Sequence, residues 1–431
     1  MMNLKKYKLA DIAKIEISGV DKKTIEGEIP VRLCNFVDVY YNWAITKEKA
    51  KSFMVASAKQ TEIDKCSIGK GMVAITKDSE TRDDIGVATY IADDFEDVVL
   101  GYHCALIIPN PSVVDGKYLN AFMHTRYIQK YFENNASGSG QRYTLSNDTI
   151  GNIPVLLPSI EEQHTIGKML ADIDRKIELN KRINDNLEAM AKQLYDYWFV
   201  QFDFPNEEGK PYKTSGGEMV WNDNLKREIP KFFLVKSLSD IITVKDGTHD
   251  SPKPQNTGYY LLTSKHLTVS GLDYSSAYKI SAEDYENINK RSKVDTNDIL
   301  FSMIGTIGNK YFVEEEHVNF AIKNMALFKT STEKWFAEYL YLYISSFDYK
   351  RYEKNSLSGS IQKFISLKTL RDMPILFHEN TIKAFAERVW NIMAMSIVLR
   401  KENIKLTKQR DELLPLLMNG QATINYHLSD D

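Results

Sequence analysis

The stretch IPVLLPSIEEQHTIGKMLADIDRKIELN, residues 153–180, decides the fold, because it joins a short apolar strand directly to a long helix. Ser159 can cap this helix, and Glu162, three residues later, completes the capping box that is typical of a helix N-terminus. Apolar residues then recur at spacings of three and four as far as Tyr197. The pattern predicts a helix over 159–199, about 60 Å long, with the narrow apolar face of one coiled-coil strand.

The same arrangement occurs a second time near the end of the chain. Residues 371–385, RDMPILFHENTIKAF, match residues 151–165, GNIPVLLPSIEEQHT, so that Pro374 lies 220 positions after Pro154. Farther upstream, the Gly-Ser stretches SGSGQRY and SGSIQKF precede the two helices, and LADI near the start has a counterpart in LSDI of the second half. The chain is therefore a tandem duplication of a globular module followed by a helix.

The second helix is predicted over 378–420. Its apolar spacing begins at Ile382, and Pro415 and Gly420 are expected to end it. Polar residues interrupt its apolar face and leave the register of any helix pair open. These residues are Ser396, Asn403 and Arg410.

The globular halves are rich in Val, Ile, Tyr and Phe with frequent turn residues, as in mixed α/β modules with short strands. The fold class predicted is α+β, with two such modules separated by two long helices that form an antiparallel coiled coil, in a pseudo-two-fold repeat. The alternative is that each helix covers the core of its own module. The predicted divisions are module 1–154, helix 155–200, linker 201–231, module 232–374, helix 375–420 and tail 421–431.

The composition is that of an ordinary folded protein. Of 431 residues, 43% are hydrophobic and 26% charged, and no apolar run approaches the ~20 residues needed to span a bilayer. The start lacks the apolar core of a secretory signal. Cys34, Cys66 and Cys104 fit neither a disulfide framework nor a four-ligand zinc site, so a cytoplasmic location is expected. The net charge of -3 means that any positive charge for DNA must be local.

Motifs for catalysis are missing from the sequence. There is no phosphate-binding loop of the G-x-x-x-x-G-K-[ST] type and no histidine pair with metal-ligand spacing. The run Asn110-Pro111-Ser112-Val113 lacks the second proline and the aromatic residue of an amino-methyltransferase motif, and GTIGN at 305–309 is too short for a cofactor site. The chain is therefore predicted to be a binding protein without catalytic residues, metal or cofactor of its own.

Two stretches resemble a known family, the specificity subunits of type I restriction–modification enzymes. They are residues 153–221, from IPVLLPSIEEQ to GGEMVW, and residues 401–421, KENIKLTKQRDELLPLLMNGQ. The resemblance extends over essentially the whole chain. It implies two target-recognition domains held apart by an antiparallel coiled coil, with each domain reading one half of a split sequence in double-stranded DNA.

The same resemblance implies partners and cofactors. Two copies of an adenine methyltransferase subunit would dock on the conserved regions, and a motor-nuclease restriction subunit would complete the enzyme. S-adenosylmethionine, ATP and Mg would then be bound by those subunits. Two alternatives stay open, a coiled-coil scaffold that does not read DNA and a self-sufficient methyltransferase or nuclease, although the missing cofactor motifs argue against the latter.

Candidate DNA-binding residues in the first module are polar, aromatic and basic side chains of three turn-rich segments. Base edges are read by donors and acceptors on exposed loops, whereas Lys, Arg and hydroxyl contacts to phosphate position the protein. The alternative to DNA contact is that the Gly-Ser segment is only a flexible turn and that the tyrosines belong to the core. The residues are Asn35, Tyr40, Tyr41 and Asn42, then Thr76, Lys77, Ser79, Thr81 and Arg82, and finally Ser139, Gln141, Arg142 and Tyr143.

The second module offers an equivalent set of candidates, for which the alternative is an ordinary surface loop with an Asp-Gly turn. They are Lys245, Thr248, His249, Ser251 and Lys253, then Ser264, Lys265 and His266, and finally Ser360, Gln362 and Lys363. Just past the first helix, four aromatic residues are expected to pack at the helix end or against a methyltransferase subunit. They are Trp198, Phe199, Phe202 and Phe204.

Overall fold

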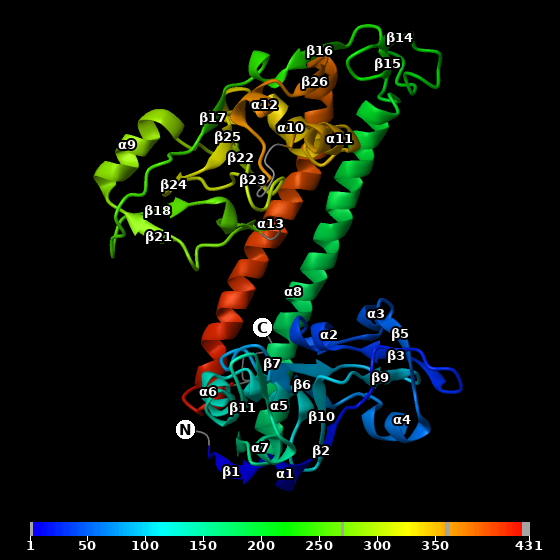
Figure 1. The fold of residues 1–431 in the computed structure, drawn as a ribbon, viewed down its shortest axis with the longest axis vertical. Coiled ribbons are helices and arrows are strands. Elements are labelled where there is room, and N and C mark those ends of the chain that lie inside the picture. The colour runs from blue at the N-terminus through cyan, green and yellow to red at the C-terminus, as the bar shows by residue number, and fades with distance from the viewer. Residues whose placement is uncertain (1–2, 269–270, 358–362, 425–431) are drawn as a thin grey trace, which may run out of the picture. The chain divides into compact units, whose positions relative to one another are not determined.

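A computed structural model describes residues 3–268, 271–357 and 363–424 (Figure 1). The chain forms two compact units. Unit 1 consists of Met1–Leu179 together with Glu402–Asp431, and unit 2 consists of Asn180–Lys401. Each unit contains one globular module and a part of each long helix, so the structure is of the mixed α+β class.

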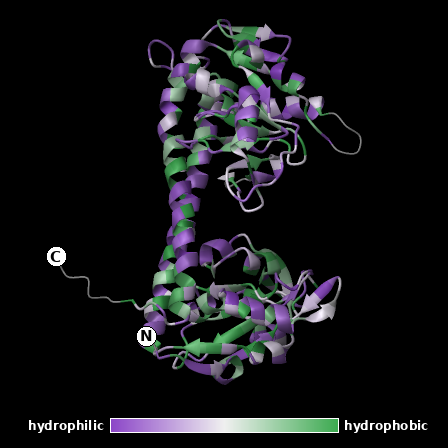
Figure 2. Ribbon diagram, turned by 90° about the vertical axis from the view of Figure 1, so that its left-hand side faces the viewer, coloured by the Kyte–Doolittle hydropathy of each residue, from purple (hydrophilic) through white to green (hydrophobic). Residues whose placement is uncertain are grey.

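Unit 1 contains a five-stranded sheet in the order β2-β10-β6-β8-β4, whose strands are largely hydrophobic (Figure 2). Further sheets have the orders β5-β3-β9, β11-β12-β7 and β1-β13. The strands are β1 (Lys5–Lys8), β2 (Ala13–Ile17), β3 (Ile29–Cys34), β4 (Ala44–Ile45), β5 (Met54–Ala58), β6 (Val73–Thr76), β7 (Asp78–Ser79), β8 (Ala88–Ile91), β9 (Val98–Leu100), β10 (Cys104–Pro109), β11 (Ser137–Ser139), β12 (Arg142–Thr144) and β13 (Pro154–Leu157).

The main core of unit 1 lies between the five-stranded sheet and helices α5 and α6, and it also includes Leu414, Leu417 and Met418 from the end of the chain. A second core joins the sheet β5-β3-β9 to the opposite face of the larger sheet. The helices are α1 (Leu9–Ile12), α2 (Phe36–Tyr40), α3 (Lys47–Ala50), α4 (Gln60–Cys66), α5 (Gly116–Met123), α6 (Arg126–Asn135), α7 (Asn147–Gly151) and α8 (Ile160–Tyr195).

Unit 2 contains a four-stranded sheet, β17-β25-β22-β23, a three-stranded sheet, β21-β18-β24, and the pairs β14-β15, β16-β26 and β19-β20. The strands are β14 (Met219–Asn222), β15 (Arg227–Pro230), β16 (Leu234–Ser237), β17 (Val244–Asp246), β18 (Tyr259–Leu262), β19 (Leu267–Thr268), β20 (Gly271–Leu272), β21 (Tyr278–Ile280), β22 (Ile299–Ser302), β23 (Lys310–Phe312), β24 (Phe320–Ile322), β25 (Met325–Phe328) and β26 (Pro374–Phe377). Its helices are α9 (Ala282–Ser292), α10 (Ala337–Tyr343), α11 (Phe347–Ser356), α12 (Leu367–Arg371) and α13 (Glu379–Met418), the last of which continues into unit 1.

The internal repeat is present in the strand pairing of both units. In unit 1, β1 pairs antiparallel with β13, so that Lys8 faces Pro154. In unit 2, β16 pairs antiparallel with β26, so that Ser237 faces Pro374. The first strand of each module is therefore bonded to the strand that leads into the long helix.

A buried tyrosine occurs at nearly the same offset in both units. The Tyr118 hydroxyl donates to the Leu156 carbonyl at 2.8 Å, and the Tyr339 hydroxyl donates to the Leu376 carbonyl at 2.9 Å. Both carbonyls belong to the strand that precedes a long helix. A buried carbonyl without a donor would destabilise the fold. Each tyrosine therefore fixes the helix that carries it, α5 for Tyr118 and α10 for Tyr339, to that strand.

The long helices begin where the sequence predicts. The capping box is formed, because the Glu162 carboxylate accepts from the Ser159 amide at 3.0 Å and the Ser159 hydroxyl accepts from the Glu162 amide at 3.3 Å. The first helix ends in a π-helical turn, Asp196–Val200. The second helix also ends where Pro415 and Gly420 predict, since α13 continues to Met418 and Gly420 has φ 74°. Pro415 has no N–H to donate to the Asp411 carbonyl, so one backbone bond is missing just before the helix ends.

Within each unit, contacts between α8 and α13 run antiparallel. In unit 1, the Asn403 side chain donates to the Ile177 carbonyl at 3.2 Å, and Arg410 lies 3.7 Å from the Asp174 carboxylate. In unit 2, Ser396 is hydrogen-bonded to Asn184, and the rings of Phe385 and Tyr195 lie 6.1 Å apart. The three polar residues of the second helix therefore all have partners on the first helix.

The aromatic residues that follow α8 belong to the core of unit 2. Trp198, Phe199, Phe202 and Phe204 are each no more than 4% exposed, and Phe199 lies edge-on to Phe385 at 5.0 Å. The expected packing at the helix end is therefore observed. The segment 201–231 carries the hairpin β14-β15 and contributes to this core.

Replacing either Tyr118 or Tyr339 by phenylalanine should lower the free energy of unfolding by about 1 kcal/mol, because a buried strand carbonyl loses its donor. Urea unfolding followed by tryptophan fluorescence measures this loss. Tyr41→Phe is the matched control, since Tyr41 is 76% exposed and its replacement should leave stability unchanged. Variants as stable as the parent chain would show that these bonds do not hold the modules closed.

Candidate functional site

In unit 1, two segments that the sequence analysis treated separately form one small sheet. Residues 137–144 are a hairpin, and its second strand pairs with β7, so that Tyr143 faces Ser79. Gly138 has φ 142°, and a Cβ there would lie 2.1 Å from the Arg142 carbonyl oxygen. Only glycine fits this position of the hairpin.

The buried carboxylate of Asp78 lies at the centre of this sheet. Its Oδ2 accepts from Arg142 at 3.1 Å and from Lys77 at 3.2 Å, and it lies 2.8 Å from Nδ1 of His103. Burial alone would raise the pKa of Asp78. Hydrogen bonds from His103 and Thr144 and the charge of Lys77 have the larger combined effect and lower the pKa to about 2. Asp78 is therefore ionised and holds three basic side chains together.

Aromatic rings lie beside these basic side chains. The Arg82 guanidinium lies over the Tyr143 ring at 5.0 Å, and the Lys77 ammonium lies over the Tyr102 ring at 5.4 Å. We name the exposed and half-exposed basic side chains of this group the first basic cluster. It consists of Lys77, Arg82, His103 and Arg142.

The remaining candidates of this group lie close by in the chain. Ser79 pairs with Tyr143, Thr81 donates its amide to the Ser79 hydroxyl at 3.3 Å, and Gln141 is exposed at the tip of the hairpin. The backbone of Ser139 belongs to β11, while its side chain lies outside the described part of the structure.

Two first-module candidates are buried and support the backbone. The Asn35 side chain is 8% exposed and caps α2 by accepting from the Phe36 amide at 2.8 Å. Thr76 is fully buried, and its hydroxyl accepts from the Val87 amide at 3.0 Å. Both residues are therefore largely withdrawn from the surface of unit 1.

The other candidates near α2 differ in exposure. The Tyr40 hydroxyl donates to the Asp84 carboxylate at 2.9 Å, and the Asn42 side chain donates to the Asp38 carbonyl at 2.8 Å. Tyr41 is 76% exposed and meets Tyr40 edge-on at 4.8 Å. Of this segment, Tyr41 is the side chain most available to a partner.

Unit 2 contains a comparable group around Asp246. Its carboxylate lies 3.0 Å from Nε2 of His249 and is hydrogen-bonded to Arg291, while Nδ1 of His249 lies 2.8 Å from the Asn324 side-chain oxygen. Burial raises the pKa of Asp246, but the hydrogen bond and charge of Arg291 together with the hydrogen bond from His249 outweigh it, and the pKa lies below its usual value. Lys323 donates to the Ser251 hydroxyl beside this group.

We name His249, Arg291 and Lys323 the second basic cluster. The candidate residues predicted for this module differ in their relation to the cluster. His249 belongs to the cluster and Ser251 contacts it, whereas Thr248, Ser264 and His266 are buried. Four others are exposed or half-exposed without a contact to the cluster, and two lie outside the described residues. The four are Lys245, Lys253, Lys265 and Lys363, and the two are Ser360 and Gln362.

The sequence analysis missed several members of these groups. Asp78 lies between two residues that were predicted, and acidic residues were not considered as organising groups. His103 joins the first group because β10 follows it and pairs with β6. Arg291 and Lys323 come from a helix and a strand end far along the chain, so only the tertiary structure brings them to His249.

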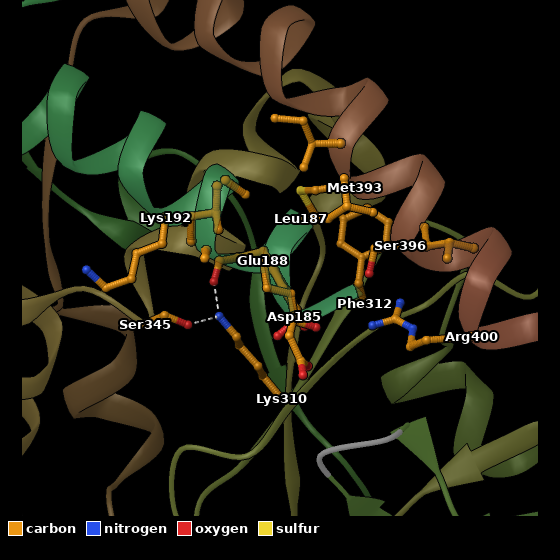
Figure 3. Close-up of a pocket in the computed structure, with 16 residues that line it drawn as sticks. Asp185, Leu187, Glu188, Lys192, Lys310, Phe312, Ser345, Met393, Ser396 and Arg400 are labelled. Atoms are coloured by element: carbon orange, nitrogen blue, oxygen red, sulfur yellow. Dashed lines mark hydrogen bonds between the residues drawn. The ribbon is translucent and has the colours of Figure 1, made fainter. Parts of the chain in front are cut away.

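A cavity of about 410 Å³ in unit 2 is bounded by α8, α13, β23 and α10 (Figure 3). Lys310 points into it, donates to the Ser345 hydroxyl at 2.5 Å and to the Tyr341 carbonyl, and lies over the Tyr341 ring. Burial lowers the pKa of Lys310 to about 7, although the charge of Glu188 opposes the shift. The ammonium of Lys310 therefore loses its proton near neutral pH.

Neither a metal cluster nor a membrane helix is found among the described residues. No group of three His, Cys, Asp or Glu side chains there has metal-ligand geometry. None of the helices in the same ranges is long and apolar enough to cross a bilayer. Cys34, Cys66 and Cys104 are buried free thiols, and burial raises the pKa of each.

Comparisons with known proteins agree on one family. Residues 1–189 match the family model for the type I restriction modification DNA specificity domain. The type I restriction enzyme MjaIX specificity subunit of Methanocaldococcus jannaschii is 27% identical over 337 residues, 74% of this chain and 71% of that protein. The HindI specificity subunit of Haemophilus influenzae is 24% identical over 409 residues, 80% of this chain and 85% of that protein.

A solved structure has a similar fold. The crystal structure of the S subunit of a type I restriction–modification system from M. genitalium superimposes with a TM-score of 0.59 and covers 96% of each chain. Its sequence is 14% identical, so the likeness concerns the fold alone.

Lys310 predicts a pH dependence of stability. Its pKa is 10.5 in the unfolded chain and about 7 when folded, so the unfolded state binds more protons between these values and stability rises with pH across that window. Lys310→Met should abolish this contribution. The melting temperature of the parent chain minus that of Lys310→Met should therefore increase from pH 7 to pH 9.

Lys265→Met, at an exposed lysine of the same unit, is the matched control and should give a difference that is independent of pH. A constant difference for Lys310→Met as well would mean that Lys310 is charged throughout this range.

Proposed function

We propose how this chain, which belongs to the family of type I restriction enzyme specificity subunits, recognises DNA: each globular module reads one half of a two-part target. The family recognises DNA sequence and carries out no catalysis itself. The proposal adds the assignment of one half-site to each module and of particular side chains to each half-site.

The observation that carries the proposal is the presence of one basic cluster in each unit, organised by one carboxylate of low exposure. Asp78 holds Arg142 in unit 1, and Asp246 holds Arg291 in unit 2. A side chain that is already fixed loses less conformational entropy when it binds, and its N–H groups have a defined direction. Such groups suit contacts with a base edge or a phosphate.

The two arginines are the side chains best suited to base readout, because a guanidinium can donate two bonds to O6 and N7 of guanine. Lys77 and Lys323, as point charges, suit phosphate contacts that set the position of the DNA. Tyr41 adds an exposed ring at the surface of the first module. The net charge of -3 agrees with charge that is concentrated at these clusters.

The long helices are proposed to act as the spacer between the half-sites and as the docking face for two adenine methyltransferase subunits. In support, contacts between α8 and α13 are antiparallel within each unit. In unit 2 the helices also expose apolar side chains, as an interface with another protein would require. These are Met190, Trp390, Met395 and Val398, between 44% and 58% exposed.

The chemistry is assigned to the partners. The methyltransferase subunits would hold S-adenosylmethionine, and a motor-nuclease subunit would hold ATP and Mg. The specificity chain contributes the choice of sequence and the distance between its two parts.

Arg142→Ala should relax sequence preference in one half-site and Arg291→Ala in the other. Each should lower DNA affinity by about 1–3 kcal/mol, because a directed donor to DNA is lost. The chain is co-expressed with its methyltransferase subunit, and methylated adenines are mapped across a genome. Each variant is the control for the other half-site.

Lys210→Ala removes an exposed positive charge that belongs to neither basic cluster, and it should leave the methylation map unchanged. A map in which Arg142→Ala disturbs both halves equally would contradict the assignment of one module to one half.

A heptad inserted in both helices tests the spacer. The insertions go after Leu179 and after Lys401. In each helix this point lies between the residue of the Asn403–Ile177 contact and the residue of the Ser396–Asn184 contact. Each helix is lengthened by about 10.5 Å. The gap between the half-sites should grow by about three base pairs, with both halves unchanged. An unchanged gap would remove the spacer role from the helices.

A further inference from the structure

A cleft in unit 2 lies where the chain leaves α8 and where α13 begins. It encloses about 760 Å³ and shares no residue with the second basic cluster. The residues of its wall that bear on its chemistry are Trp198, Phe204, Glu207, Glu208, Tyr212 and Phe232.

The cleft is lined by aromatic rings. Phe204 stacks on Tyr212 with the ring centroids 5.0 Å apart, and Phe232 meets Tyr212 edge-on at 5.3 Å. The His378 ring completes this wall at 4.6 Å from Phe232. Phe232 is 41% exposed, so part of the aromatic surface is open to solvent. Clustered rings of this kind attract cations through their electron-rich faces.

The charge of the lining is negative. It includes the carboxylates of Glu207 and Glu208 and no lysine or arginine among the described residues. Glu208 forms an ion pair with Lys210 at 2.8 Å, but both side chains are about two-thirds exposed and such pairs contribute little. Burial lowers the pKa of His378, so its imidazole adds no positive charge at neutral pH.

Backbone bonds hold the cleft in shape. The Tyr212 amide donates to the Phe204 carbonyl at 3.0 Å, and the Asn206 amide donates to the Lys210 carbonyl at 2.8 Å. The Tyr212 hydroxyl also donates to the Glu218 carbonyl at 2.9 Å. A cleft that is already formed needs little reorganisation to bind a ligand.

We propose that this cleft binds an arginine side chain presented by an extended segment of a partner protein. The guanidinium would lie against the Phe232 and Tyr212 rings and donate to the Glu207 or Glu208 carboxylate. The inference depends on the chemistry of the cleft alone and not on the reading of DNA by either module.

Arginine fits better than lysine for two reasons. Its guanidinium is planar and weakly hydrated, so it stacks on an aromatic ring, and its fork of donors matches a carboxylate. The chain itself pairs cations with rings in this region, since Arg388 lies over the other ring of the wall, Trp198, at 5.6 Å.

The test uses the full chain and the peptide acetyl-Gly-Arg-Gly-amide, with binding followed by ligand-observed NMR and by tryptophan fluorescence. Saturable binding is expected. The citrulline peptide, which has the same shape without the charge, should bind about tenfold more weakly, and the lysine peptide about threefold more weakly.

Two variants connect the binding to the cleft. Phe232→Leu keeps an apolar side chain but removes the exposed ring, and Glu207→Gln removes one carboxylate; each should weaken the arginine peptide about three- to tenfold. Glu283→Gln, at an exposed carboxylate of α9, is the matched control and should bind like the parent chain. Equal melting temperatures verify that the variants are folded.

Three results would overturn the proposal. One is the absence of saturable arginine binding up to about 20 mM peptide. Another is equal affinity for the arginine and citrulline peptides. The third is unchanged affinity in both Phe232→Leu and Glu207→Gln. None of these results bears on DNA recognition, which the methylation maps test separately.

Discussion

Each module is closed by the hydrogen bonds of one antiparallel strand pair, β1 with β13 and β16 with β26. The pairing brings the start of a module to the strand that leads into its long helix. A buried tyrosine then bonds the helical layer to the same strand, Tyr118 in unit 1 and Tyr339 in unit 2. The direction in which each helix leaves its module is thereby tied to the module's own core, and this holds for both copies of the repeat.

Much of the fold could be predicted because its signals are local. Apolar spacing, the capping box at Ser159 and the repeated proline-bounded strand are readable from neighbouring residues. The register of the helix pair depends on contacts between residues far apart in the sequence. It could not be predicted, because polar residues interrupt the apolar face of the second helix at Ser396, Asn403 and Arg410. The structure gives each of them a partner on α8 within its unit. Polar contacts across a helix pair penalise any other register, so residues that look unfavourable for packing select the alignment.

The candidate sites could be predicted only in part, because sequence indicates which residues are polar and not which of them meet. Lys77 and Arg142 were both candidates, but a sheet that joins residues 65 positions apart makes them neighbours. Thr76 was a candidate of the same kind and is fully buried, since it belongs to a central strand. Asp78 was overlooked because its role is to hold cations, which no local pattern shows. The cleft of unit 2 likewise depends on rings from distant segments.

Unit 2 is one continuous stretch, Asn180–Lys401, whereas unit 1 is assembled from both ends of the chain. Leu414, Leu417 and Met418, which follow all of unit 2 in the sequence, complete the core of unit 1. On the ribosome, the second unit can therefore finish folding before the first, although the first is synthesised earlier. A chain truncated before Leu414 lacks residues that complete the core of unit 1. Such a chain would expose apolar surface to proteases and chaperones.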